Sequence, residues 1–190
     1  ISAKRLTRRR FLKVDPYKSS LIRRLKFKSK EVLSELKDAK DLYNDAVGDF
    51  CIAVDFYCST MEIDNPLESI AKNIKEEEKE ELNNNFKKLF RKISVLTHPD
   101  KTKDEDSRDI LEDAVEAKKA KDAGGLTSIA HDLKIDLSNL DYDSIDFLEE
   151  SIKNSEQEIF NIHNSYPWAW YYAPENKKDP ILISFIQNYV

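Results

Sequence analysis

Apolar residues recur at three- and four-residue steps along most of the chain, which is the spacing of one face of an α-helix. Residues 50–61 are mainly apolar, and we expect them to continue the preceding helix past Gly48, because no second strand candidate is available to pair with them. The pattern therefore predicts an all-α protein. It is clearest in residues 29–47, where charged residues separate Val32, Leu33, Leu36, Ala39, Leu42, Tyr43 and Ala46.

Helix boundaries are predicted by proline, glycine and capping residues. Pro66 suits the first position of a helix, where the missing N–H of proline costs nothing. Residues 66–97 are then expected to form one long helix or two consecutive helices, interrupted only at the three asparagines 83–85. Gly124 and Gly125 are expected to break the helical pattern. The remaining predicted helices are residues 106–122, 126–135, 144–165 and 180–189.

Length and composition agree with one helical domain, or with a small domain that carries helical arms. The chain has 190 residues, of which 40% are hydrophobic and 35% charged, with only 3 Gly and 6 Pro. Such a chain is too apolar to be disordered and has too few turn residues for a sandwich of many strands. No run approaches 18 apolar residues, so we expect no membrane partner and a cytoplasmic location.

The net charge of −5 is the sum of two very different regions. Residues 1–30 contain 12 of the 31 Lys and Arg residues and a single acidic residue, which leaves a net charge of about −16 on the rest. A basic segment of this density is attracted to an anionic protein or to nucleic acid. The alternative is a solvated basic arm with no dedicated partner. The candidate anion-binding residues are Arg5, Arg8, Arg9, Arg10, Arg23 and Arg24.

Residues 7–13 also resemble a twin-arginine export signal, but the apolar run that such a signal requires does not follow them. The two cysteines, Cys51 and Cys58, would lie about 10.5 Å apart along a helix axis, which is too far for a disulfide. We expect both to be buried thiols in a reducing compartment. The sequence has no glycine-rich phosphate loop, nucleophile motif or metal-ligand spacing, so we expect no enzymatic activity, no cofactor and no metal.

The most informative segment ends at His98-Pro99-Asp100. An apolar stripe precedes this tripeptide and must face a partner helix, and Pro99 ends the helix, so that His98 and Asp100 lie on an exposed turn. The next predicted helix, 106–122, is expected to pack back against the first as an antiparallel hairpin. The stripe consists of Phe86, Leu89, Phe90, Ile93 and Leu96, and a separate basic face consists of Lys87, Lys88, Arg91 and Lys92.

Residues 86–101 resemble the second helix and loop of a J-domain, the module of DnaJ-type co-chaperones, and a weaker likeness extends over residues 66–123. The resemblance implies that His98, Pro99, Asp100 and the basic face bind an ATP-bound DnaK-type chaperone and stimulate its ATP hydrolysis. It implies that His98 is a contact residue and that Asp100 pairs with an arginine of the partner. The sequence departs from the family at Thr97 and Lys118, where a tyrosine is common, and in lacking an aromatic-rich first helix.

These observations divide the chain into four parts: a basic arm (1–30), a helical extension (31–63), a J-domain-like hairpin (64–123) and a C-terminal helical and aromatic segment (124–190). Residues 166–172 include five aromatics, which predict either a core contact or a binding surface. The tail is similar to those of short J-domain proteins of bacteriophages. This likeness implies a location in the host cytoplasm or the virion. An alternative function is a structural or assembly protein, for example a virion component, that uses the hairpin as a scaffold and the arm for docking.

Overall fold

The computed structural model describes residues 15–72, 81–102 and 105–189. Every regular element in these ranges is a helix, which confirms the all-α prediction. The helices are α1 (Pro16–Met61), α2 (Pro66–Lys72), α3 (Asn84–Thr97), α4 (Glu105–Lys119), α5 (Ala123–Asp132), α6 (Tyr142–His163), α7 (Tyr166–Tyr171) and α8 (Glu175–Tyr189).

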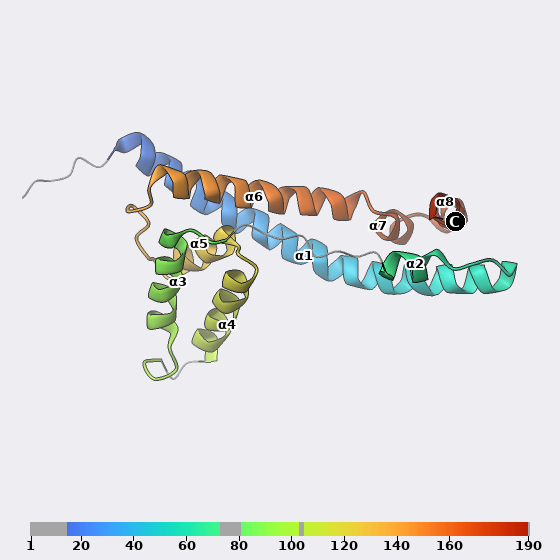
Figure 1. Cartoon of the computed structure of the whole chain (residues 1–190), viewed down its shortest axis with the longest axis horizontal. Coiled ribbons are helices and arrows are strands. Elements are labelled where there is room, and N and C mark those ends of the chain that lie inside the picture. The colour runs from blue at the N-terminus through green and yellow to red at the C-terminus, as the bar shows by residue number, and fades with distance from the viewer. Residues whose placement is uncertain (1–14, 73–80, 103–104, 190) are drawn as a thin grey trace, which may run out of the picture.

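Two long helices, α1 and α6, lie side by side and run in the same direction (Figure 1). Near their first turns, the Tyr142 hydroxyl donates a hydrogen bond of 2.7 Å to Oδ2 of Asp15. Further along, Lys28 and Glu156 form an ion pair at 2.8 Å. Asp15 also caps α1, because its Oδ1 accepts the backbone N–H of Tyr17 at 3.0 Å. With 46 residues, α1 is about 69 Å long, so it connects all parts of the molecule.

The helix α1 continues without a break through residue 30 and through Gly48. The predicted continuation past Gly48 is therefore confirmed. Residues 16–30 of the predicted basic arm are helical as well, and they bury Ile22 and Leu25 against the other helices. Burial of these two side chains explains why a segment so rich in like charges is ordered, because the apolar contacts offset the repulsion among its cations.

The buried side chains form two separate clusters along α1. The proximal core joins the first half of α1 to α3, α4, α5 and α6, and the distal core joins its second half to α2, α7 and α8. Within the distal core, the Phe50 ring lies edge-on to Trp170 and Phe185, with ring centroids 5.7 and 5.0 Å away. The buried members of the distal core are Phe50, Val54, Cys58, Leu182, Phe185 and Ile186.

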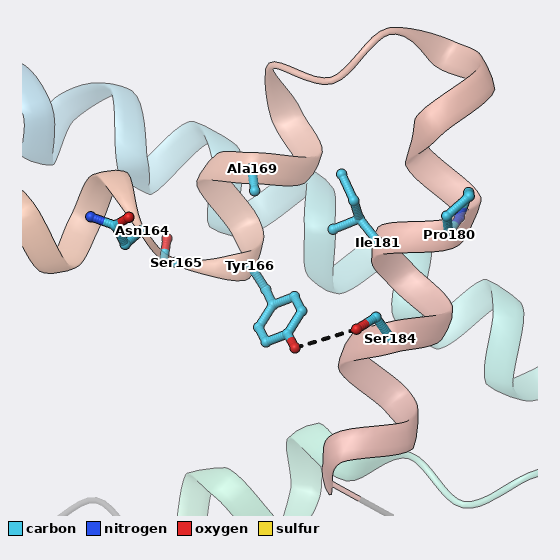
Figure 2. A pocket seen from close by; sticks show the side chains of 7 residues that line it. All are labelled: Asn164, Ser165, Tyr166, Ala169, Pro180, Ile181 and Ser184. Atoms are coloured by element: carbon cyan, nitrogen blue, oxygen red, sulfur yellow. Dashed lines mark hydrogen bonds between the residues drawn. The ribbon is translucent and has the colours of Figure 1, made fainter.

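The C-terminal aromatic run forms α7 and closes the molecule between the two cores. Trp168 packs against the proximal core and Trp170 against the distal core, which supports the core-contact prediction for both tryptophans. A cleft of about 300 Å³ lies between α7 and α8 (Figure 2), where the Tyr166 hydroxyl and Ser184 Oγ are 3.5 Å apart. The last helix starts at Glu175 and not at Pro180, because a proline near a helix start is tolerated.

Both cysteines are free, as predicted. Cys58 is buried in the distal core and Cys51 is half-buried. Desolvation raises the pKa of both thiols, and the neighbouring Asp55 carboxylate raises it further. Both side chains therefore behave as protonated, apolar groups near neutral pH.

The prediction that Gly124 and Gly125 break a helix is wrong. Both glycines lie in the first turn of α5, and the chain turns earlier, at Lys121, whose φ of 56° is left-handed. The glycines serve close packing instead. A Cβ on Gly125 would lie 2.7 Å from Asp122 Oδ2 and 3.0 Å from the Cβ of Ala117 in α4. The backbone of Gly124 is also held from two sides, since its N–H donates to Ser151 and its carbonyl accepts from Ser29.

Gly125→Ala is therefore expected to destabilise the protein by about 1–3 kcal/mol, because the added methyl group has no room beside Asp122 and Ala117. Gly48→Ala is the matched control: nothing lies within 4 Å of an added Cβ there, and we expect a gain of about 0.5–1 kcal/mol. Urea unfolding of the two variants measures both changes. A gain in stability for Gly125→Ala as well would contradict the packing role of Gly125.

Candidate functional site

The helices α3 and α4 form an antiparallel pair that projects from the α1–α6 spine, and the connection between them includes His98, Pro99 and Asp100 (Figure 1). The base of this pair is fixed by α5, which contacts α1, α3 and α4. The tripeptide therefore lies at the end of the pair that points away from the spine (Figure 1).

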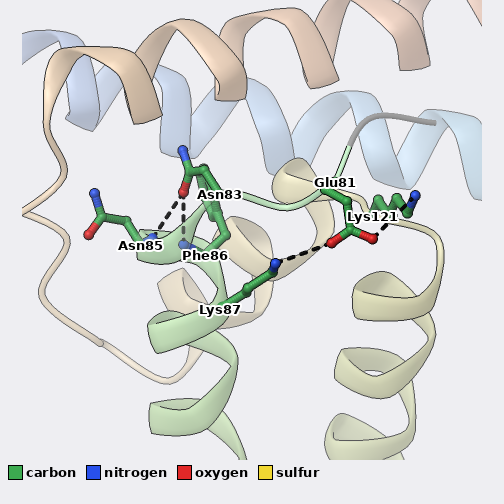
Figure 3. Close-up of polar contacts among 6 residues, drawn as sticks. All are labelled: Glu81, Asn83, Asn85, Phe86, Lys87 and Lys121. Carbon is green, nitrogen blue, oxygen red and sulfur yellow. Dashed lines mark hydrogen bonds and ion pairs between the residues drawn. The ribbon is translucent and has the colours of Figure 1, made fainter.

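The start of α3 is set by the asparagines that interrupt the helical pattern in the sequence. Asn83 caps the helix, because its Oδ1 accepts the backbone N–H groups of Asn85 and Phe86 at 3.0 and 3.2 Å (Figure 3). The side-chain amides of Asn83 and Asn85 both donate to Ser144 Oγ at the start of α6, at 3.0 and 2.9 Å. Asp141 caps α6 and also accepts from Asn85. These bonds fix the direction in which α3 leaves the spine.

The inner face of α3 differs from the prediction at one position. Phe86, Leu89 and Ile93 are buried as predicted, and Phe90 is half-buried, but Leu96 is exposed. Thr97 takes the buried position, because it continues the four- and three-residue steps of Phe86 and Ile93. Its hydroxyl group donates to the carbonyl of Ile93 at 3.0 Å, so the buried polar atom is satisfied. A threonine before His98 is thus accommodated by the helix itself.

The turn after α3 is closed by hydrogen bonds to His98. Its carbonyl accepts the backbone N–H groups of Lys101 at 2.9 Å and Thr102 at 3.1 Å. Its backbone is extended, with φ −64° and ψ 134°, as expected for a residue that precedes proline. These bonds involve only the main chain of His98. The turn therefore holds its shape independently of the imidazole.

The imidazole and the carboxylate of the tripeptide face each other and are open to solvent. Nδ1 of His98 accepts the backbone N–H of Asp100 at 3.2 Å and lies 3.5 Å from Asp100 Oδ2. Because Nδ1 is an acceptor, Nε2 holds the imidazole proton. The His98 side chain is 53% exposed and that of Asp100 is 88% exposed. This arrangement presents one donor and one carboxylate to a partner.

The predicted basic face of α3 is present, but its members differ in environment. Lys88, Arg91 and Lys92 are exposed and form no ion pair within the described residues. Lys87 is half-buried and pairs with Glu81 at 3.1 Å (Figure 3). The hydrogen bond from Lys87 lowers the pKa of Glu81, and the nearby Lys121 lowers it further. Lys87 is therefore partly neutralised, and the other three cations form the accessible basic surface.

Sequence reasoning missed the cations that α4 contributes. Lys118 lies over the Phe90 ring, with Nζ 4.4 Å from the centroid, so it occupies the position of the family's tyrosine against an aromatic neighbour. An antiparallel hairpin brings the end of α4 to the start of α3, and this rule could have placed these lysines beside Lys87. They line a groove of about 530 Å³ with Glu81, Leu82, Lys87, Phe90, Arg91, Lys118, Lys119 and Lys121.

A second depression, of about 390 Å³, lies next to the tripeptide on the outer side of α3. Its floor is apolar and includes the exposed Val95 and Leu96 and the buried Ile135, which belongs to the segment between α5 and α6. Arg91 and Lys92 also line it. A partner at this surface would therefore meet apolar and cationic groups together.

The six arginines predicted to bind an anionic partner are only partly described. Arg23 and Arg24 are exposed on α1. Arg5, Arg8, Arg9 and Arg10 lie outside the described residues. Arg23 and Arg24 therefore belong to the spine, on a different element from the basic face of α3.

None of the helices in the described part of the chain is long and apolar enough to span a membrane. Within the same residues, no three His, Cys, Asp or Glu side chains are grouped closely enough to hold a metal ion. No protein-family model, curated protein or solved structure matches the chain.

Proposed function

We propose that the protein is a J-domain-type co-chaperone that recruits a DnaK-type chaperone and stimulates its ATP hydrolysis. The observation that carries the proposal is the position of His98, Pro99 and Asp100: an exposed turn directly after a helix whose outer face is cationic. The likeness of residues 86–101 to the second helix and loop of a J-domain supports the same conclusion. The helices α2, α3 and α4 would then correspond to the J-domain-like region.

In this proposal the protein acts by contact and performs no chemistry. Lys88, Arg91 and Lys92 attract an acidic surface of the chaperone and orient the encounter, because a charged face raises the association rate. The exposed Asp100 carboxylate accepts hydrogen bonds from an arginine of the partner, and Nε2 of His98 donates to an acceptor. The net charge of about −16 outside residues 1–30 makes the cations of this one face unusual, and selection for an acidic partner explains them.

The basic face is tested by reversing its charge. The wild-type protein is expected to accelerate single-turnover ATP hydrolysis by a purified DnaK-type chaperone. The triple variant Lys88→Glu/Arg91→Glu/Lys92→Glu is expected to need at least about tenfold more protein for half-maximal stimulation, because the favourable field becomes repulsive. A control with the same charge change, Lys37→Glu/Lys153→Glu/Lys177→Glu, alters exposed lysines of α1, α6 and α8 and should retain the wild-type value. Wild-type protein that leaves hydrolysis unchanged would refute the proposal.

A second candidate function is that of a structural or assembly protein, for example a virion component. The observation in its favour is that α1 leaves Ile52 and Phe56 exposed at the end of the spine remote from the hairpin. Exposed apolar groups of this size are typical of a contact with another protein. Stable, stoichiometric incorporation of the protein into a larger complex supports this function, and the two functions are compatible.

A further inference from the structure

The second half of α1 has an exposed apolar stripe on the face opposite its buried side. Ile52 is 69% exposed and Phe56 is 75% exposed, whereas Phe50 and Val54 are buried in the distal core. Gly48 precedes Ile52 by one helical turn, and nothing lies within 4 Å of a Cβ built on it. Gly48, Ile52 and Phe56 therefore form a hollow followed by two apolar side chains on one line of the helix.

The surroundings of this stripe are acidic. Residues 41–71 contain seven Asp or Glu residues and no Lys, Arg or His. All seven carboxylates are exposed, and Asp45, Asp49 and Asp55 lie within a turn of the apolar stripe. The α2 end of the spine adds no positive charge before Lys72. We call Asp45, Gly48, Asp49, Ile52, Asp55 and Phe56 the distal patch.

The charge of the distal patch selects its occupant. A second distal patch is a poor partner, because an antiparallel pairing centred on Ile52 places Asp49 of each copy against Asp55 of the other, and like charges in contact are unfavourable. The occupant must therefore combine several cations with apolar side chains. Its apolar side chains would fill the space above Gly48 and cover Ile52 and Phe56.

The chain itself contains a segment of this composition. Residues 1–14 have six Lys or Arg residues and no acidic residue. Phe11 and Leu12 directly follow Arg8, Arg9 and Arg10, which is the only run of three arginines in the sequence. The segment therefore complements the distal patch in both charge and hydrophobicity.

The geometry of α1 prevents the arm from reaching the distal patch of its own copy. Ile52 lies 37 residues beyond Asp15, which is about 55 Å along the helix. Residues 8–12 are separated from Asp15 by at most seven peptide units, which span no more than about 25 Å when fully extended. Only the arm of another molecule can place residues 8–12 on the patch.

We propose that residues 1–14 of one copy bind the distal patch of a second copy, so that the protein associates head to tail. The interface is heterologous, because an arm meets a patch, and each added copy leaves one free arm and one free patch. The proposal concerns surfaces remote from the hairpin and does not depend on chaperone recruitment.

The test uses two complementary variants of the full chain. The arm variant is Arg8→Glu/Arg9→Glu/Arg10→Glu, and the patch variant is Ile52→Ser/Phe56→Ser. In sedimentation velocity over a range of concentrations, wild-type protein is expected to form oligomers that grow with concentration and weaken with added salt. Each variant alone should remain a monomer. An equimolar mixture should form a dimer and nothing larger, because only one functional arm and one functional patch remain in each pair.

Control variants show whether association depends specifically on the arm and the distal patch. Phe160→Ser removes an aromatic side chain that is 60% exposed on α6 and should associate like wild type. A fluorescent peptide of residues 1–14 should bind the arm variant at least about tenfold more tightly than it binds a variant that combines the arm and patch changes. His98→Gln should associate like wild type, so a failure of the chaperone proposal is distinguishable from a failure of this one.

Three results would overturn the proposal. Wild-type protein that stays monomeric at all concentrations would do so. Self-association retained by the arm variant would show that a second patch is the occupant. Binding of the wild-type arm to nucleic acid or to anionic vesicles, with the equimolar mixture of arm and patch variants still monomeric, would assign the arm to a partner other than this chain.

Discussion

His98→Gln is expected to abolish stimulation of chaperone ATP hydrolysis while leaving the fold intact. The glutamine side chain lacks the imidazole ring and cannot present a donor at the position of Nε2. The turn should survive, because Lys101 and Thr102 donate to the backbone carbonyl of residue 98 and not to its side chain. The stability change should remain within about 0.5 kcal/mol, as is usual for an exposed site. Single-turnover hydrolysis and thermal unfolding measure the two quantities.

The chain offers a matched control for this substitution. His163 is exposed at the end of α6, on a different element from the tripeptide, and stacks on Trp168 with ring centroids 4.5 Å apart. His163→Gln makes the same chemical change, and we expect it to stimulate the chaperone like wild type. If His98→Gln stimulates as well as His163→Gln, the tripeptide is not the contact and the co-chaperone proposal loses its main support.

The elements of this fold that depend on local chemistry were predictable from the sequence. Pro66 starts α2, Asn83 caps α3, and the chain leaves the helix before Pro99, because each of these residues restricts or satisfies the backbone within one turn. The free cysteines follow from helix geometry alone. Local signals were sufficient for the helix ends because the interacting groups are four or fewer residues apart.

Features that depend on distant residues were not predictable in the same way. The parallel direction of α1 and α6 is fixed by contacts such as Tyr142 to Asp15, 127 residues apart, and an amphipathic pattern does not specify direction. The packing role of Gly125 depends on Ala117 of α4, which local sequence rules do not take into account. Leu96 is exposed although its spacing predicts burial, because periodicity cannot show where a partner helix diverges.

The candidate site shows the same division. The exposed turn at His98 follows from Pro99, and the exposure of Lys88, Arg91 and Lys92 follows from the apolar stripe on the other side of α3. The pairing of Lys87 with Glu81 and the groove shared with α4 require the tertiary structure, because the groove joins the start of one helix to the end of another.

Phe50→Ala is expected to destabilise the protein by about 3–5 kcal/mol. The ring is 1% exposed and fills the space among α1, α7 and α8. Its removal also ends the edge-on contacts with Trp170 and Phe185. Phe56→Ala in the same helix is the control: its ring is largely exposed, so the loss should stay within about 0.5 kcal/mol. Urea unfolding at a concentration where both variants are monomeric gives the two values.

The distribution of this loss tests whether the two cores unfold separately. The described members of the distal core do not include any residue of α3 or α4, so opening of the distal core should leave the hairpin folded and still able to stimulate the chaperone. Hydrogen exchange should therefore accelerate in α8 and in the second half of α1, with α3 still protected. Equal acceleration in α3 would show instead that α1, which passes through both cores, couples them into one cooperative unit, because a break in the middle of a 46-residue helix would then cost more than unfolding the whole chain.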